Sequence, residues 1–293
     1  MRRRRRRDVH CRLRLPLGGL TGDRLPAGAP APAEPLASGP MCGRFVASRP
    51  IDEIARLLEV DEIDPALDAA PARWNVAPQA DVAAVSEPHL EPGRRRLSVY
   101  RWGLVPWWAK DPSIGTRAFN AKAETLTGKA MFRGAVLKQR CLIPVDAFYE
   151  WAPAAKSDPA RRKQPWCFKA PGSGLLLLGG LWERWRPRND ESAVPLFTCT
   201  ILTTEANDLV RPVHDRMPVL VAEADIAEWL AAEPLEQDEL HRLTQPAPKD
   251  ALEAFQISAK VNDAREDGPE LIEPVGPSEQ EPAGSGERAP QLF

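Results

Sequence analysis

Short strand-like runs of apolar and polar residues recur along the chain, and turns containing glycine and proline separate them. Every second side chain of a β-strand points to the same face, so runs of this length and period predict strands. We expect strands over residues 81–86, 97–102, 141–145, 166–169, 175–181 and 197–203.

Helical periodicity is confined to a few short segments. Residues 51–60 place apolar side chains three and four positions apart, and Ser48 and Pro50 supply start signals. Further helices are expected over residues 122–128, 224–232 and 236–243. Because strands predominate and do not alternate regularly with helices, the pattern predicts a single α+β domain with a largely antiparallel sheet.

The two ends differ from the rest of the chain in composition. Residues 1–41 open with a run of arginines and continue through proline, alanine and glycine without periodicity, so we expect a disordered extension. The apolar segment after the arginines is too broken for a secretory signal, so either translation starts at Met41 or the extension is a removable propeptide. The folded domain is expected over residues 42–275, followed by a disordered tail over 276–293.

Charge and hydropathy exclude several classes of protein. The net charge is −2, yet residues 1–40 hold nine arginines and three acids, so the remainder is acidic and any nucleic-acid site must be a local patch. Candidate patches are Arg94–Arg96, Arg133–Arg140 and Arg161–Lys163, although a solvated surface explains each of them better. No apolar stretch approaches the roughly 18 residues of a membrane span, so we expect a cytoplasmic protein without a membrane partner.

The spacing of cysteine and histidine argues against a metal centre. The five cysteines form no C-x-x-C pair and the four histidines are scattered, so neither a metal nor another cofactor is expected. An odd number of widely spaced cysteines fits a reducing compartment better than a disulfide framework.

The segment Met41-Cys42-Gly43-Arg44-Phe45 offers unusual chemistry if the mature chain begins at Cys42. A free α-amine would then lie beside the thiol, and α-amines titrate close enough to neutrality for a nucleophilic fraction to be present. Such an amine forms a Schiff base with an aldehyde, and the thiol can close a five-membered thiazolidine on the same carbon. On its own, the motif is better explained by a cysteine that packs near an N-terminus.

Three further segments concentrate polar groups. Asn120 and Lys122 lie together in FNAKAE, Glu150 lies among aromatic residues in FYEW, and His214 lies in VHDRMP. Aromatic neighbours would desolvate Glu150 and raise its pKa, as a general acid requires, although an exposed glutamate on a strand explains FYEW about as well. A lone histidine is more often structural, but the aspartate and arginine that follow could orient His214.

Two tryptophan-containing segments bear on a substrate. The segment WGLVPWW is too aromatic, and too broken by glycine and proline, for a simple helix. We assign Trp102 to the core and expect Trp107 or Trp108 to be exposed, where an indole can stack on an unpaired base. The segment RWNVAP reads as a turn, in which Asn75 could bind a backbone phosphate or cap the turn.

The motifs MCGRF, WNVAP, WGLVPWW, FNAKAET, FYEW, HDRMP and VNDAREDGPELIEP follow one another between Met41 and about Val275. In this order they resemble the SRAP family, the SOS response-associated peptidases or abasic-site processing proteins. The resemblance implies a largely antiparallel pseudo-barrel with flanking helices. It implies binding to single-stranded DNA, covalent linkage to a ring-opened abasic deoxyribose, self-cleavage before the cysteine, and a place at the nucleoid when DNA is damaged.

The resemblance also implies roles for individual residues. Four positions match the chemistry: the nucleophile Cys42, the asparagine that positions the linkage (Asn120), the acid that assists ring opening (Glu150) and the histidine of Schiff-base formation and reversal (His214). Five match DNA contacts: Arg44, Asn75, Trp107, Trp108 and Lys122. Arginine is usual at the position of Lys122, so this chain loses a bidentate phosphate contact there.

Other classes of protein remain open on the sequence. Glutamine amidohydrolases also begin Met-Cys-Gly and use the thiol as nucleophile, but they continue into apolar, glycine-rich sequence, whereas Arg44 and Phe45 follow here. A non-catalytic module for single-stranded DNA would need no chemistry from Cys42. A peptidase acting on other proteins would use the cysteine and histidine, but no segment for a peptide-binding groove is recognisable.

Overall fold

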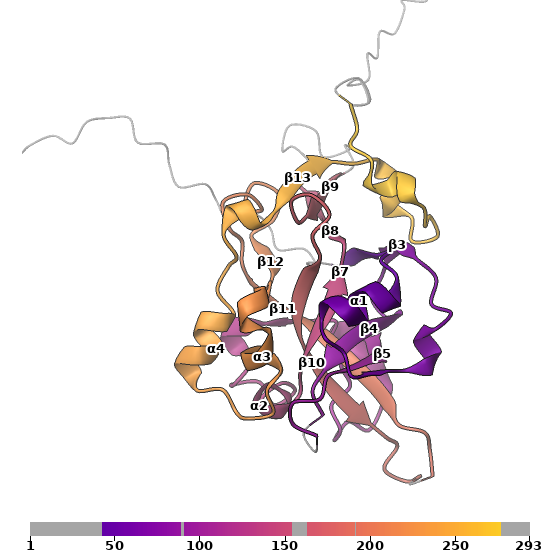
Figure 1. Ribbon diagram of the computed structural model, residues 1–293, viewed down its shortest axis with the longest axis vertical. Helices are drawn as coiled ribbons and strands as arrows, with labels where there is room; N and C mark the ends of the chain where they lie inside the picture. The colour runs from indigo at the N-terminus through magenta and orange to yellow at the C-terminus, as the bar shows by residue number, and fades with distance from the viewer. Residues whose placement is uncertain (1–42, 89–90, 154–162, 191, 277–293) are drawn as a thin grey trace, which may run out of the picture. The chain divides into compact units, whose positions relative to one another are not determined.

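A computed structural model describes residues 43–88, 91–153, 163–190 and 192–276 (Figure 1). Its strands are β1 (Arg44–Ala47), β2 (Glu62–Ile63), β3 (Arg73–Val76), β4 (Asp81–Ser86), β5 (Arg96–Trp102), β6 (Asn120–Lys122), β7 (Arg140–Val145), β8 (Ala147–Ala152), β9 (Gln164–Lys169), β10 (Leu176–Trp185), β11 (Leu196–Glu205), β12 (Arg216–Pro218) and β13 (Glu253–Gln256). Its α-helices are α1 (Ile51–Leu57), α2 (Ala135–Lys138), α3 (Ile226–Leu230) and α4 (Gln237–Leu243), and short 3-10 turns such as η2 (Pro112–Arg117) and η3 (Ala123–Thr125) connect the strands.

The strands form two sheets, and the larger one closes on itself. Strands β11, β10, β7, β4 and β5 are hydrogen-bonded in that order, and β5 pairs in turn with β11. The closing pair is parallel and the other four are antiparallel, so the five strands form a small mixed barrel. The second sheet has the order β13-β9-β8-β1-β3. The predicted α+β class with a largely antiparallel pseudo-barrel is therefore confirmed.

Alternation along the barrel strands explains why both faces of the sheet are buried. On β7, Cys141 and Ile143 belong to a core cluster that contains Phe45 of β1 and Phe148 of β8. The intervening Leu142 belongs to a second cluster on the opposite face. Because successive side chains of a strand point to opposite faces, one strand contributes to both cores.

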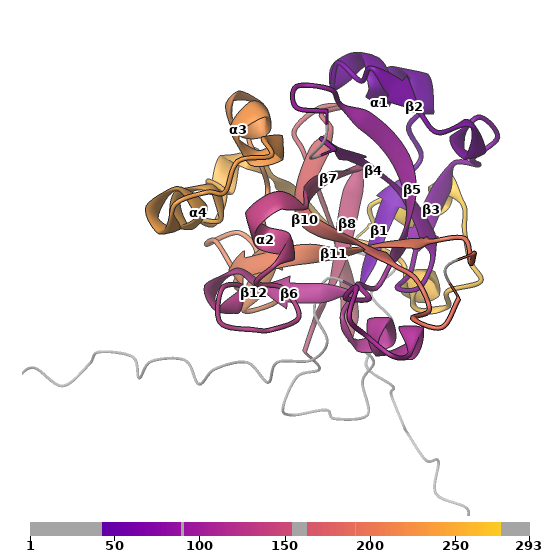
Figure 2. The ribbon, with the colours of Figure 1, turned by 90° about the horizontal axis from the view of Figure 1, so that it is seen from below.

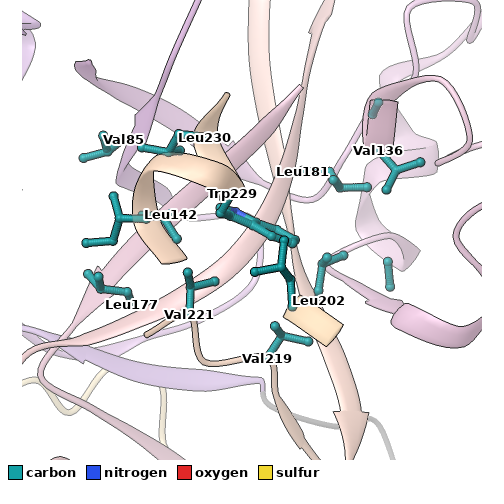
Figure 3. Packing of buried hydrophobic residues seen from close by; sticks show 14 of the residues in the cluster. Val85, Val136, Leu142, Leu177, Leu181, Leu202, Val219, Val221, Trp229 and Leu230 are labelled. Atoms are coloured by element: carbon teal, nitrogen blue, oxygen red, sulfur yellow. The ribbon is translucent and has the colours of Figure 1, made fainter. Parts of the chain in front are cut away.

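The second core lies beneath the helices that cover the barrel sheet. Trp229 of α3 is fully buried, and Figure 3 shows its ring among Leu142, Leu177, Leu202 and Val221. Its indole N–H donates to the carbonyl oxygen of Cys141 at 2.9 Å, so the ring brings no unsatisfied donor into the core. This anchor fixes α3 against the barrel.

The turn that follows β1 is fixed by a single carboxylate. Asp146, between β7 and β8, accepts hydrogen bonds from the backbone N–H groups of Ser48 and Arg49 at 2.8 and 3.1 Å. It also pairs with the Arg49 guanidinium at 3.1 Å. These contacts set the direction in which β1 leaves the five-strand sheet and α1 begins.

The predicted elements agree with the structure in most places. The six predicted strands are confirmed as β4, β5, β7, β9, β10 and β11, and three predicted helices appear in shorter form as α1, α3 and α4. The predicted helix over 122–128 is wrong, because residues 120–122 pair with β11 as β6 and the chain then makes a 3-10 turn. The segment 73–78 is not a turn at its start, because Arg73–Val76 pairs with β1 as β3.

The predicted extension over 1–41 lies outside the described residues, as does the predicted tail apart from its first position. Within the described part of the chain, no helix is long and apolar enough to cross a bilayer.

Candidate functional site

The position proposed as nucleophile, Cys42, lies outside the described residues, and the description begins at its neighbour Gly43. Strand β1 pairs with β8 in a register that sets Arg44 opposite Tyr149 and Phe45 opposite Phe148. Continuing this antiparallel register by one residue sets Gly43 opposite Glu150. The residue next to Cys42 therefore lies opposite the predicted acid.

Glu150 is a buried carboxyl group in the middle of a sheet. Its residue is only 2% exposed, and β9 covers the other edge of its strand through the pair Glu150–Trp166. The burial expected from its aromatic neighbours is confirmed, and the alternative of an exposed glutamate is wrong. A carboxyl group held in a fixed, buried position is a candidate for proton transfer.

Asn120 and Lys122 are placed by β6, which runs parallel to β11. Asn120 pairs with Ile201, and Lys122 pairs with Thr203. On its other side, Thr203 pairs with Pro218 of β12. Asn120 is half-buried, whereas Lys122 is exposed. Strand β11 thus pairs both with the strand of the asparagine motif and with the strand of the histidine motif. Figure 2 shows β6, β11 and β12 close together.

A salt bridge connects the same two motifs. The Arg216 guanidinium donates to both carboxylate oxygens of Glu124 at 2.6 and 2.8 Å, and to the carbonyl oxygen of Thr203 at 2.7 Å. The arginine side chain is only 11% exposed and that of Glu124 is 47% exposed, so the pair joins a largely buried guanidinium to a carboxylate at the surface. This contact between FNAKAET and HDRMP was not predicted from the sequence, although both residues lie in motifs that were singled out.

His214 lies just before β12 with its ring largely buried. Its Nδ1 lies 3.1 Å from the Arg216 backbone N–H, which donates to it, and 3.0 Å from Oδ1 of Asp215. Burial lowers the pKa of His214 below its ordinary value, although Asp215 opposes the shift. The ring is therefore mainly neutral at pH 7. With its Nδ1 lone pair occupied by the Arg216 N–H, it carries its proton on Nε2.

Arg44 and Asn75 belong to a network with the C-terminal part of the domain. The Arg44 guanidinium donates to Oδ1 of Asn75 at 2.8 Å and to the carbonyl oxygen of Val261 at 3.0 Å. The Asn75 amide donates to the carbonyl oxygens of Val261, Asp263 and Glu266. Asn75 is only 1% exposed, so this geometry does not support a direct DNA contact and makes Asn75 a residue that orients Arg44.

The three tryptophans of WGLVPWW have different environments. Trp102 is fully buried and its indole N–H donates to the carbonyl oxygen of Phe119 at 2.8 Å, so its assignment to the core is confirmed. Trp107 is 64% exposed and Trp108 is intermediate, which confirms that the end of the segment reaches solvent. An exposed indole held next to a folded core is a suitable surface for base stacking.

Fold and site together define an α+β barrel protein that carries a buried acid and a half-buried amide on its strands and a histidine beside them. The model of the SOS response associated peptidase (SRAP) family matches residues 41–264. The chain belongs to this family, and the resemblance found in the motifs is confirmed.

Relatives named as abasic site processing proteins match this chain, and the two from Bacillus subtilis match over nearly their whole length. The abasic site processing protein YoqW of Bacillus subtilis is 40% identical over 233 residues, which are 80% of this chain and 99% of the relative. The abasic site processing protein YoaM of the same organism is 38% identical, over 80% of this chain and 98% of the relative. The abasic site processing protein HMCES of Gallus gallus is 31% identical, over 69% of this chain and 66% of the relative.

Solved structures share the fold at lower identity. A crystal structure of a protein from Bacteroides thetaiotaomicron superposes with a TM-score of 0.69 at 19% identity, covering 80% of this chain and all of that one. A protein from Bordetella bronchiseptica superposes with a TM-score of 0.59 at 23% identity, covering 74% of this chain and all of that one. These two likenesses concern the fold alone.

Proposed function

We propose that this protein processes abasic sites in single-stranded DNA by forming a covalent thiazolidine link through Cys42. The observation that carries the proposal is the register of β1 on β8, which sets Gly43, the neighbour of Cys42, opposite the buried Glu150. The relatives named as abasic site processing proteins support the same substrate. No metal or other cofactor is part of the proposal.

The bonds formed and broken balance without an oxidant or reductant. The α-amine of Cys42 adds to the C1′ aldehyde of the ring-opened deoxyribose, and the resulting carbinolamine loses water to give a Schiff base. The thiol of Cys42 then adds to the same carbon, while its proton passes to the imine nitrogen. One water molecule is released, and C1′ ends up bonded to both nitrogen and sulfur.

The described residues supply proton transfer and orientation. Glu150, buried beside the start of β1, donates a proton to the deoxyribose ring oxygen as the ring opens and regains one from the C1′ hydroxyl that becomes the aldehyde. It then donates this proton to the hydroxyl that leaves as water and regains one from the carbinolamine nitrogen. His214 is mainly neutral at pH 7 because burial lowers its pKa, and during formation or reversal of the Schiff base it can take up a proton at Nδ1, where Oδ1 of Asp215 lies 3.0 Å away. Asn120 orients the linkage from β6.

DNA binding is assigned to residues outside this acid–base group. Trp107, with the neighbouring Trp108, stacks on an unpaired base, and the exposed Lys122 contacts a phosphate. Arg44 contacts the DNA backbone near Cys42 while Asn75 holds its guanidinium in place. These contacts position the lesion and leave its chemistry to the strands.

The mechanism needs a free α-amine on Cys42, and we propose that the protein removes the preceding residues itself. Hydrolysis of the Met41–Cys42 peptide bond consumes one water molecule and leaves the amine beside the thiol. An amide nitrogen at this position would not form a Schiff base, so cleavage must precede crosslinking.

The intact mass of the protein expressed from Met1 tests both steps. We expect a mass that begins at Cys42, and an increase by one strand of DNA, less one water, after incubation with an abasic single-stranded oligonucleotide. A full-length mass without adduct, together with no adduct from protein that begins at Cys42, would contradict the proposal. Glutamine hydrolysis by that same preparation would favour the amidohydrolase class.

A further inference from the structure

The loop that carries Trp107 lies on one face of the β10–β11 hairpin, and side chains of that face hold every second residue of the loop. The Val105 backbone N–H donates to Oγ1 of Thr198 at 2.9 Å. The Trp107 backbone N–H donates to the Glu183 carboxylate. The Ala109 carbonyl oxygen accepts from the indole N–H of Trp185 at 2.8 Å. We call Glu183, Trp185 and Thr198 the loop platform.

The loop platform is built by strand pairing. Glu183 of β10 is the cross-strand partner of Thr198 of β11, so the two side chains share one face of the hairpin. Trp185 lies two residues further on and belongs to a small apolar cluster with Val105 and Ala109 of the loop. The backbone of residues 105–109 is therefore fixed, while the Trp107 side chain stays 64% exposed.

The charge of Glu183 is energetically unfavourable at this buried position. It is only 4% exposed, and its carboxylate also accepts hydrogen bonds from the Gln139 side chain and the Arg184 backbone N–H. The shifted pKa of Glu183 arises from burial and hydrogen bonds, and not from the charges of the cations on the elements around this end of β10: Arg101, Lys110, Lys138, Arg140, Arg184, Arg186 and Arg188. A buried carboxylate without a cation costs stability, and glutamine would fill the same space without charge.

We propose that Glu183 is a positioning residue for DNA binding, whose carboxylate holds the backbone of Trp107 so that the exposed indole is preorganised to stack on an unpaired base. The inference rests on the proposed binding of single-stranded DNA and assigns Glu183 no part in the chemistry. Holding the loop before DNA arrives lowers the entropy cost of ordering it on binding. This gain explains why a charged group is kept where a neutral one would be more stable.

The arrangement makes the contribution of Trp107 depend on pH. Burial raises the pKa of Glu183 to about 7, and its three hydrogen bonds only partly oppose this shift. Below that pH the carboxyl group gains a proton and loses an acceptor position, so its three donors share fewer lone pairs. We expect the stacking contribution of Trp107 to be complete above about pH 7 and to decline as the pH falls through that value.

Binding of an undamaged single-stranded oligonucleotide, measured by fluorescence anisotropy, tests the role apart from crosslinking. We expect Glu183→Gln to weaken binding about 3- to 10-fold at pH 8, a part of the effect that stacking of one base can have. In a Trp107→Ala background the same substitution should change the affinity by less than about 2-fold, because it acts through Trp107. Glu223→Gln removes an exposed charge on another element, η4 (Glu223–Asp225), and serves as the matched control.

The pH profile supplies a readout that does not require a Glu183 variant to fold. As the pH is lowered from about 8 to about 6, the ratio of the wild-type affinity to the Trp107→Ala affinity should decrease. Equal weakening by Glu183→Gln in both backgrounds, or a ratio that does not change with pH, would overturn the positioning role. If the wild-type protein binds no single-stranded DNA at all, the proposed function fails instead.

Discussion

The region assigned to the chemistry and the region assigned to base stacking are held in different ways. Asn120 and Glu150 lie on strands that are paired on both sides or held against β11, and the salt bridge from Arg216 to Glu124 connects the surrounding motifs. Trp107 lies on a loop without regular structure, which side chains of a neighbouring hairpin fix. Reacting groups require fixed geometry, whereas a stacking surface needs a fixed backbone beneath an exposed ring.

Removing the nucleophile should produce the largest effect and should leave the loop region unaffected. We expect Cys42→Ala, expressed so that its chain begins at the substituted residue, to form no stable crosslink, because the sulfur that closes the thiazolidine is absent. Its affinity for undamaged single-stranded DNA should stay within about 2-fold of wild type. Denaturing gel electrophoresis after incubation with abasic DNA measures the crosslink, and an unchanged yield would exclude the thiazolidine mechanism.

Glu150→Gln, in the region assigned to the chemistry, should slow the crosslinking rate without changing the affinity for DNA. An amide cannot transfer a proton, so crosslinking at saturating DNA should slow by about 10²-fold, at the lower end of what general acid–base catalysis contributes. Binding of undamaged DNA should not change. A rate profile between pH 5 and pH 8 equal to that of wild type would show that Glu150 has no part in proton transfer.

Glu183→Gln should change stability in a way that reveals the buried charge beneath the loop. The raised pKa means that the folded protein binds this proton more tightly than the unfolded chain does. The tighter binding of this proton contributes fully to the free energy of unfolding below about pH 4.5, and this contribution is lost as the pH rises through about 7. Between low pH and pH 8, the free energy of unfolding of the variant should therefore rise by roughly 3 kcal/mol relative to that of wild type, as measured by urea unfolding. A constant difference would mean that Glu183 titrates normally.

Trp107→Ala should produce the smallest effect and confine it to binding. Loss of one stacked base should weaken the affinity for single-stranded DNA by about 1–3 kcal/mol. The crosslinking rate at saturating DNA should remain close to wild type, because the residues of the chemistry lie on other elements. Leu57→Ala removes another exposed apolar side chain, on α1, and should leave the affinity unchanged. A slower rate at saturation would show that the two regions are coupled.

Patterning predicted the longer strands well and the short ones poorly. Strands β4, β5, β7, β9, β10 and β11 have enough alternating residues to be recognised locally. Strand β6 has three residues and forms because it pairs with β11, and β3 forms because it pairs with β1. Such short segments depend on partners that are remote in the sequence, so local propensity did not indicate them.

The candidate site shows the same division. The motifs identified Glu150, Asn120 and His214 as chemical groups. They did not reveal that Glu150 is buried or that the Nδ1 atom of His214 accepts a backbone hydrogen bond. They also suggested Asn75 as a DNA contact, whereas its amide is used up by three carbonyl groups of the C-terminal segment. Arg140, included in a candidate basic patch, is buried and donates to backbone carbonyl groups.

The sequence by itself determined the family, the α+β class, most of the strands and the identity of the candidate chemical residues, because these depend on local pattern and on residue type. The tertiary structure decided which groups are buried, which are paired and which remain exposed. Closure of the barrel by the β5–β11 pair brings remote segments together, and only their packing makes Asn75 internal, Trp107 exposed and Glu183 a buried charge. Burial and hydrogen bonding are properties of neighbours in space, and a linear pattern does not specify them.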